Sequence, residues 1–145
     1  MAEFLSPLDV RFIDGHDWEV RAPFEYHLGH DDGDECVSIP AGFVTDFASI
    51  PRGLWNVLPP TGPYGKAAVV HDWLYQRRRI VNHRTGLARL VERGEADRIL
   101  NEGMAVLGVG RFTRWMVYSG VRMGGWKPWG HYRAQERHDD VDPRA

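Results

Sequence analysis

The hydrophobic pattern of this chain changes its period about a third of the way along it. Up to Thr45 the apolar residues come in short, partly alternating runs of strand length, and from Tyr64 onward they recur at helical spacing. The strand-like runs are residues 8–13, 18–21, 24–28, 36–39 and 43–45. Strands followed by helices favour an α+β domain, in which a small N-terminal antiparallel sheet of three to five strands precedes about three helices packed together.

The second part of the chain predicts three main helices. The first is expected over residues 64–79, because apolar residues recur there at i, i+3, i+4, i+7 and i+8. The second is expected over residues 87–107 and the third over residues 112–123. Glycine and proline make residues 124–129 irregular in this interpretation.

Length and composition set the expected domain organisation. A chain of 145 residues with 43% hydrophobic content can build one ordinary core without metal or disulfide. We expect a single globular domain over residues 1–132 and a polar, flexible tail over residues 133–145. Cys36 is the only cysteine, which excludes an internal disulfide and a cysteine-based zinc cluster.

Charge and hydropathy exclude several classes of function. The formal net charge is −2, which argues against a generally basic, nucleic-acid-binding surface. No apolar run approaches the roughly 20 residues of a transmembrane helix. The first residues lack the basic-then-apolar layout of a secretion signal, so we expect synthesis in the cytoplasm without a signal peptide.

The segment HDWLY carries the most promising chemistry. His71 lies within the most regular helical segment, and Tyr75 is expected to stack on it because residues four apart share a helix face. Asp72 is turned by about 100° toward another side. Two further acids complete the candidate site: Asp97, where the next helix could return against the first, and Asp46, beside an apolar segment.

Such residues suit metal-assisted hydrolysis. A carboxylate can orient one imidazole nitrogen and leave the other to deprotonate water. A second carboxylate can hold a hard cation, and one His with several carboxylates fits calcium better than zinc. The alternative is structural: His71 satisfies hydrogen bonds in the core, and Asp46 caps the turn that follows it.

Two strings in the chain are distinctive: PAGFVTDFASIPR at residues 40–52 and HDWLY at residues 71–75. Together with the later Ala96-Asp97 pair, they resemble a family of phage and prophage proteins catalogued as a domain of unknown function. The likeness extends over nearly the whole chain, residues 8–130. It implies a bacteriophage or prophage origin and no settled activity.

A second, partial resemblance is to phospholipase A2, especially the disulfide-free enzyme of viral capsids, where one helix carries HDxxY and a later helix carries Ala-Asp. This likeness implies that His71 is the general base, with Asp97 as its partner and Tyr75 as the brace of Asp97. It also implies that Asp72 is a calcium ligand, to which we add Asp46 as a second candidate. The glycine-rich calcium loop of those enzymes lies well before the helix, whereas residues 61–65 directly precede it here.

Two functions therefore stand as expectations. One is a phage-encoded, calcium-assisted hydrolase of lipid esters with membrane lipid as its substrate. The other is a non-enzymatic structural or assembly protein of the virion or tail, which would have other virion proteins as partners. Trp126, Trp129 and Tyr132 near the end of the chain could bury against such a neighbour. An accessory protein acting inside the host cell is a third alternative.

Overall fold

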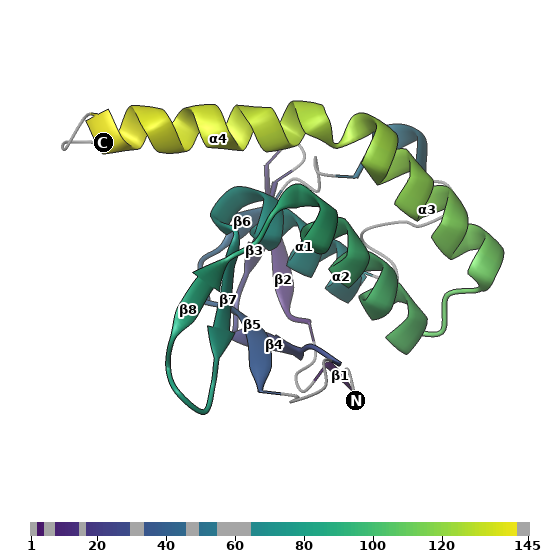
Figure 1. Ribbon diagram of the computed structural model, residues 1–145, viewed down its shortest axis with the longest axis horizontal. Helices are drawn as coiled ribbons and strands as arrows, with labels where there is room; N and C mark the ends of the chain where they lie inside the picture. Colours follow the sequence, from purple (N-terminus) through teal and green to yellow (C-terminus); the bar gives the residue numbers. More distant parts are fainter. Residues whose placement is uncertain are drawn as a thin grey trace.

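A computed structural model describes six stretches of the chain, residues 3–4, 8–14, 17–29, 34–45, 50–54 and 65–141. Within them the chain forms eight strands in two sheets, one short 3-10 turn, η1 (Arg52–Leu54), and four α-helices (Figure 1). Six of the strands precede the first α-helix. The expected α+β architecture is confirmed, with one more helix than predicted.

Five strands form the larger sheet, in the order β1-β4-β5-β7-β8 with every neighbouring pair antiparallel. They are β1 (Glu3–Phe4), β4 (Phe24–His27), β5 (Glu35–Ile39), β7 (Arg79–Asn82) and β8 (Ala88–Leu90). Along β4 the buried Phe24 and Tyr26 alternate with the more exposed Glu25 and His27. This alternation turns one face of the sheet toward the core.

The hairpin β7–β8 corrects the expected second helix. Residues 88–90 were predicted to begin that helix, but they form a fully exposed edge strand beside β7. The pairing of β7 with the distant β5 holds the hairpin on the sheet. A local hydrophobic pattern cannot reveal such a partner, because the paired residues lie more than forty positions apart in sequence.

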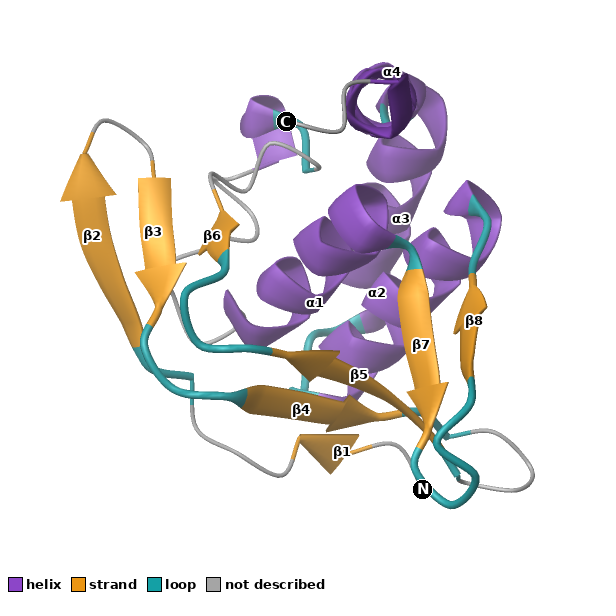
Figure 2. Ribbon diagram, turned by 90° about the vertical axis from the view of Figure 1, so that its left-hand side faces the viewer, coloured by secondary structure: helices purple, strands orange, loops and turns teal. Residues whose placement is uncertain are grey.

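Three strands form the smaller sheet, in the order β2-β3-β6. They are β2 (Val10–Asp14), β3 (Asp17–Val20) and β6 (Val44–Thr45), again antiparallel. The single N-terminal sheet that we expected is therefore two sheets (Figure 2). Pro23 lies between β3 and β4, and its missing N–H favours the break because it cannot donate to a ladder.

The four helices are α1 (Gly65–Arg77), α2 (Arg93–Val106), α3 (Arg111–Gly124) and α4 (Trp126–Val141). Helix α1 is buried from residue 67 to residue 75 and contacts β5, β6, α2 and α4 (Figure 2). Its central place explains why nearly every side chain in that stretch is enclosed. Any polar group on α1 must therefore find its partners inside the protein.

Helix α4 corrects the irregular segment that was expected at residues 124–129. Residues 126–129 were predicted to be irregular, yet they form the first turn of a helix that tolerates Pro128 at its third position. The domain boundary predicted at residue 132 does not coincide with a helix end. Arg133 instead donates hydrogen bonds to the backbone carbonyl oxygens of Tyr75 and Gln76, at 2.5 and 3.1 Å.

The core contains a small set of buried polar residues. Among the described side chains these are Thr45, His71, Asp72 and Asp97. Three of the four belong to the site predicted from the sequence. No helix in the described ranges has both the length and the apolar content needed to cross a bilayer.

Candidate functional site

His71, Tyr75 and Asp97 meet in the core. The Nε2 atom of His71 lies 2.7 Å from Oδ1 of Asp97, and the Tyr75 hydroxyl donates a hydrogen bond to the same oxygen at 2.7 Å. The rings of His71 and Tyr75 have centroids 4.3 Å apart. All three residues have an exposed fraction of 0%. The structure thus brings together the three residues that the sequence singled out as catalytic.

Helix geometry and one glycine explain this meeting. His71 and Tyr75 lie one turn apart on α1, so both side chains face α2. On α2, Gly103 lies against Ala67, and a Cβ at Gly103 would be 3.4 Å from the Ala67 Cβ. The two helices can therefore approach closely, which carries Asp97 within hydrogen-bond distance of His71.

Two arginines complete the surroundings of Asp97. A terminal guanidinium nitrogen of Arg122, on α3, donates to Oδ2 of Asp97 at 3.0 Å. Arg93 places a guanidinium nitrogen 3.5 Å from the same oxygen. Neither residue was predicted from the sequence. Arg93 is four residues before Asp97, which is an i,i+4 pair and could have been found, whereas Arg122 is a neighbour only through the packing of α3 on α2.

Helix α4 covers the tyrosine end of the site. The Trp129 ring lies edge-on to Tyr75, with centroids 5.2 Å apart, and the Arg133 guanidinium stacks over Trp129 at 4.5 Å. Gly125, at the junction of α3 and α4, is buried beside the Tyr75 hydroxyl, and a Cβ there would overlap with that oxygen. The aromatic residues near the end of the chain therefore differ in their surroundings: Trp129 packs against the core, whereas Trp126 is exposed.

The charge state of the site follows from these contacts. Burial favours a raised pKa for the Asp97 carboxyl, but the hydrogen bond and charge of His71, with the hydrogen bonds from Tyr75 and Arg122, lower the pKa overall. Burial and the negative charge of Asp97 raise the pKa of Tyr75, so its hydroxyl keeps its proton. An ionised Asp97 accepts a hydrogen bond from Nε2–H of His71, and in that tautomer of the imidazole the lone pair lies on Nδ1.

The lowered pKa of Asp97 predicts acid sensitivity. A carboxyl whose pKa is lower in the folded state stabilises the fold above its unfolded pKa of about 3.9, and this contribution is lost as the pH falls through the folded pKa. We expect the free energy of unfolding to decline as the pH falls from about 5 through the lowered folded-state pKa of Asp97. Urea denaturation at a series of pH values measures the decline. If the free energy of unfolding of Asp97→Asn depended on pH as it does in the unmodified chain, Asp97 would not be the source of the acid sensitivity.

Asp72 makes its hydrogen bonds to other residues than His71 and Tyr75. Its Oδ2 atom accepts hydrogen bonds from the Thr45 hydroxyl at 2.5 Å and from the Gln76 side-chain amide at 2.9 Å. Asp72 therefore connects α1 to β6, on the side of the helix turned away from Asp97. The structure does not bring Asp72 into the His71–Asp97 contact. Asp46, the other expected metal ligand, lies outside the described residues.

The side chains around Asp72 can be compared with the ligands that calcium prefers. Calcium takes six to eight oxygen ligands. In the described ranges no three side chains of His, Cys, Asp or Glu come together as a metal site. The Oδ2 atom of Asp72 faces two hydrogen-bond donors instead. The roles of Asp72 and Asp46 as calcium ligands stay predictions.

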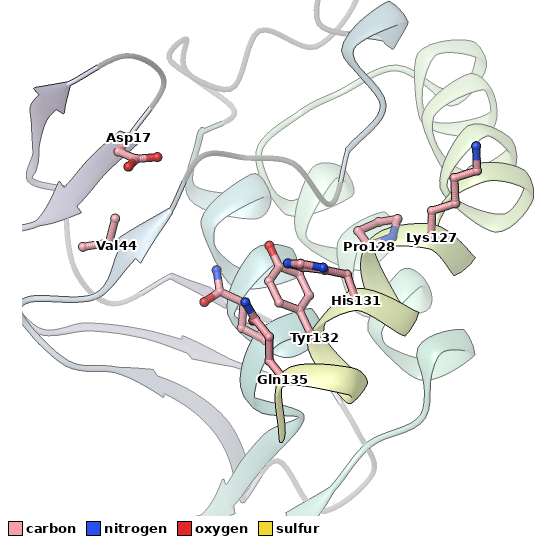
Figure 3. A pocket seen from close by; sticks show the side chains of 8 residues that line it. Asp17, Val44, Lys127, Pro128, His131, Tyr132 and Gln135 are labelled. Atoms are coloured by element: carbon pink, nitrogen blue, oxygen red, sulfur yellow. The ribbon is translucent and has the colours of Figure 1, made fainter. Parts of the chain in front are cut away.

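A cavity of about 550 Å³ lies between α4, the end of α1 and the smaller sheet. Figure 3 shows His131 and Tyr132 on α4 across from Val44 and Asp17, whereas Lys127 points away from them. Gln76, which donates to Asp72, forms part of the wall. The cavity thus reaches the Asp72 side of α1.

Comparison with known proteins identifies a family without a known activity. Residues 18–121 match the family described as "Protein of unknown function (DUF1353)". No curated protein and no solved structure matches the chain. The matched range includes His71, Asp72, Tyr75 and Asp97, so the whole predicted centre lies within the family domain.

Proposed function

The chain belongs to the DUF1353 family of unknown function, and we propose from its site that it hydrolyses lipid esters, with His71 as general base and Asp97 as the residue that orients it. The observation that carries this proposal is the 2.7 Å contact between Nε2 of His71 and Asp97, braced by the Tyr75 hydroxyl. The carboxylate holds the imidazole in one orientation and stabilises the imidazolium that forms during the reaction.

The reaction needs only a water molecule and an ester. The Nδ1 atom of His71 accepts a proton from water, and the water oxygen bonds to the ester carbonyl carbon. When the tetrahedral intermediate breaks its bond to the leaving alcohol, Nδ1 returns the proton to that alcohol oxygen. Asp97 stays ionised throughout, because its hydrogen bonds to His71, Tyr75 and Arg122 favour the carboxylate. No step is assigned to calcium.

The choice of a lipid ester rests on resemblance. The helix with HDWLY and the later Ala96-Asp97 pair are similar to the corresponding elements of phospholipase A2. There the same residue types, in the same order, act on a phospholipid ester. The PAGFVTDFASIPR string supports the further proposal that the chain comes from a bacteriophage or prophage.

Complete burial of His71 favours a second candidate. With an exposed fraction of 0%, the imidazole can reach an ester only if the elements around it open. If they do not open, the His71–Asp97 pair acts as a buried polar contact that fixes how α1, α2 and α3 pack. The chain would then be a structural or assembly protein of the virion or tail.

Fatty-acid release from phospholipid vesicles distinguishes the two candidates. The hydrolase proposal predicts release by the purified chain at neutral pH, and a much lower rate of release by His71→Gln. Parallel reactions with added calcium and with a chelator test the metal expectation separately. No release under either condition, combined with recovery of the chain as a stoichiometric component of purified particles, would instead support the structural candidate.

A further inference from the structure

Helix α3 exposes large apolar side chains along one face. Phe112, Trp115 and Met123 have exposed fractions of 69%, 63% and 79%, and Trp126 at the start of α4 is exposed by 60%. At 3.6 residues per turn, positions 112, 115 and 123 fall within about one third of the helix circumference. We call these four side chains the aromatic face of α3. Val117 and Val121, on the opposite side of α3, are buried.

The stretch of chain that carries the aromatic face has basic residues but no acidic ones. The chain has 20 acidic residues, yet residues 103–135, which contain all of α3 and the first part of α4, include no Asp or Glu. The basic residues of this stretch are Arg111, Arg114, Arg122, Lys127 and Arg133. Net charge alone hides this asymmetry, because the acids lie elsewhere in the chain.

Three of these cations lie beside the aromatic face. Arg111 and Arg122 are eleven residues apart, which is close to three helical turns, so they lie on the same side of α3. Arg111 is exposed. The Lys127 ammonium lies 5.5 Å from the centre of the exposed Trp126 ring. Aromatic side chains bordered by Arg and Lys are typical of helices that lie in the interface of an anionic membrane.

We propose that the aromatic face of α3 docks on the surface of an anionic lipid bilayer. Figure 1 shows α3 at the edge of the molecule, away from the larger sheet, where a flat surface can reach it. Phe112, Trp115 and Met123 would enter the boundary between headgroups and acyl chains, while Arg111 and Lys127 contact lipid phosphates. A second copy of this chain is a poor partner, because two such faces would repel each other.

The docking does not depend on the proposed hydrolysis, since none of the four side chains belongs to the His71–Asp97 contact. The two features are nevertheless close. Arg122 lies on the side of α3 that borders the aromatic face, and it donates to Asp97. A docked α3 would hold the buried centre next to the lipid surface.

Vesicle co-sedimentation tests the docking. We expect the full chain to bind vesicles of phosphatidylcholine mixed with phosphatidylglycerol more tightly than phosphatidylcholine alone, and less tightly at high salt. The triple variant Phe112→Ser/Trp115→Ser/Met123→Ser should bind at least roughly tenfold more weakly. Arg111→Gln should weaken binding roughly fivefold.

The matched control replaces exposed leucines far from α3. Leu87 and Leu90, at the β7–β8 hairpin, are exposed by 72% and 62%, so Leu87→Ser/Leu90→Ser should bind like the unmodified chain. His71→Gln should also bind normally, which separates docking from hydrolysis. The proposal is overturned if the triple variant binds the vesicles as tightly as the unmodified chain does. It is also overturned if the unmodified chain does not bind them. It is equally overturned by a dimer or a DNA complex in solution that the triple variant abolishes.

Discussion

Asp97→Ala is expected to lower the free energy of unfolding by about 3–5 kcal/mol. The substitution removes the acceptor of the His71 and Tyr75 hydrogen bonds, both of which are enclosed in the core. It also leaves Arg93 and Arg122 next to each other without the carboxylate that offsets their charge. Removing one residue from a cluster of buried charges is costly because the remaining charged and polar groups stay desolvated but lose their partner. Urea denaturation followed by circular dichroism measures the loss.

Two further variants test the cause of this loss. Asp97→Asn keeps the shape and one acceptor oxygen, so its effect should lie between those of the unmodified chain and Asp97→Ala. Glu19→Ala removes a carboxylate from the surface pair with Arg11 and should cost only about 0–1 kcal/mol. If Asp97→Ala cost no more than Glu19→Ala, the buried contacts would not stabilise the fold.

His71→Gln is expected to reduce fatty-acid release from phospholipid vesicles by a factor of about 10² to 10⁴. The glutamine amide can still donate a hydrogen bond to Asp97, but it has no atom that accepts a proton from water near neutral pH. The fold should therefore be largely kept while the general base is lost. Initial rates of fatty-acid release, measured beside circular dichroism spectra, separate these two effects.

The matched control for His71→Gln is His83→Gln. His83 follows β7, and nearly half of its side chain is exposed, so the same chemical change there should leave the rate unaltered. Equal rates for His71→Gln and the unmodified chain, with hydrolysis present, would remove His71 from the mechanism. Equal losses in both variants would indicate an effect of histidine removal that is not specific to the site.

Part of the site could be predicted because it depends only on the spacing of residues within one helix. The spacing of His71 and Tyr75 places them on one helix face whatever else the protein does. The Asp97 contact was harder, since it required α2 to return against α1. The sequence marked Asp97 as an acid where such a return was possible, and the resemblance gave it the role of partner to His71. Arg122 could not be predicted, because 25 residues separate it from Asp97 and no periodic pattern connects α3 to α2.

In the fold, too, features within one element could be predicted, whereas those that depend on distant partners could not. Five of the six N-terminal strands, β2 to β6, and the cores of α1, α2 and α3 follow hydrophobic periodicity, and the structure confirms them. The hairpin β7–β8 was missed because its place depends on β5. Helix α4 was missed because its first five residues include Pro128 and Gly130, which locally disfavour a helix, whereas the packing of Trp129 and Arg133 on Tyr75 stabilises it.

The amino-acid sequence by itself determined the α+β class, the helix that carries His71 and Tyr75, and the stretch without acids that surrounds the aromatic face of α3. These features follow from composition and from spacing within single elements. Only the tertiary structure decided that Asp97 lies between an imidazole and two guanidinium groups, that Asp72 faces β6, and that the whole centre is enclosed. Burial and charge pairing depend on which elements pack together, and such long-range contacts leave no periodic trace in the chain.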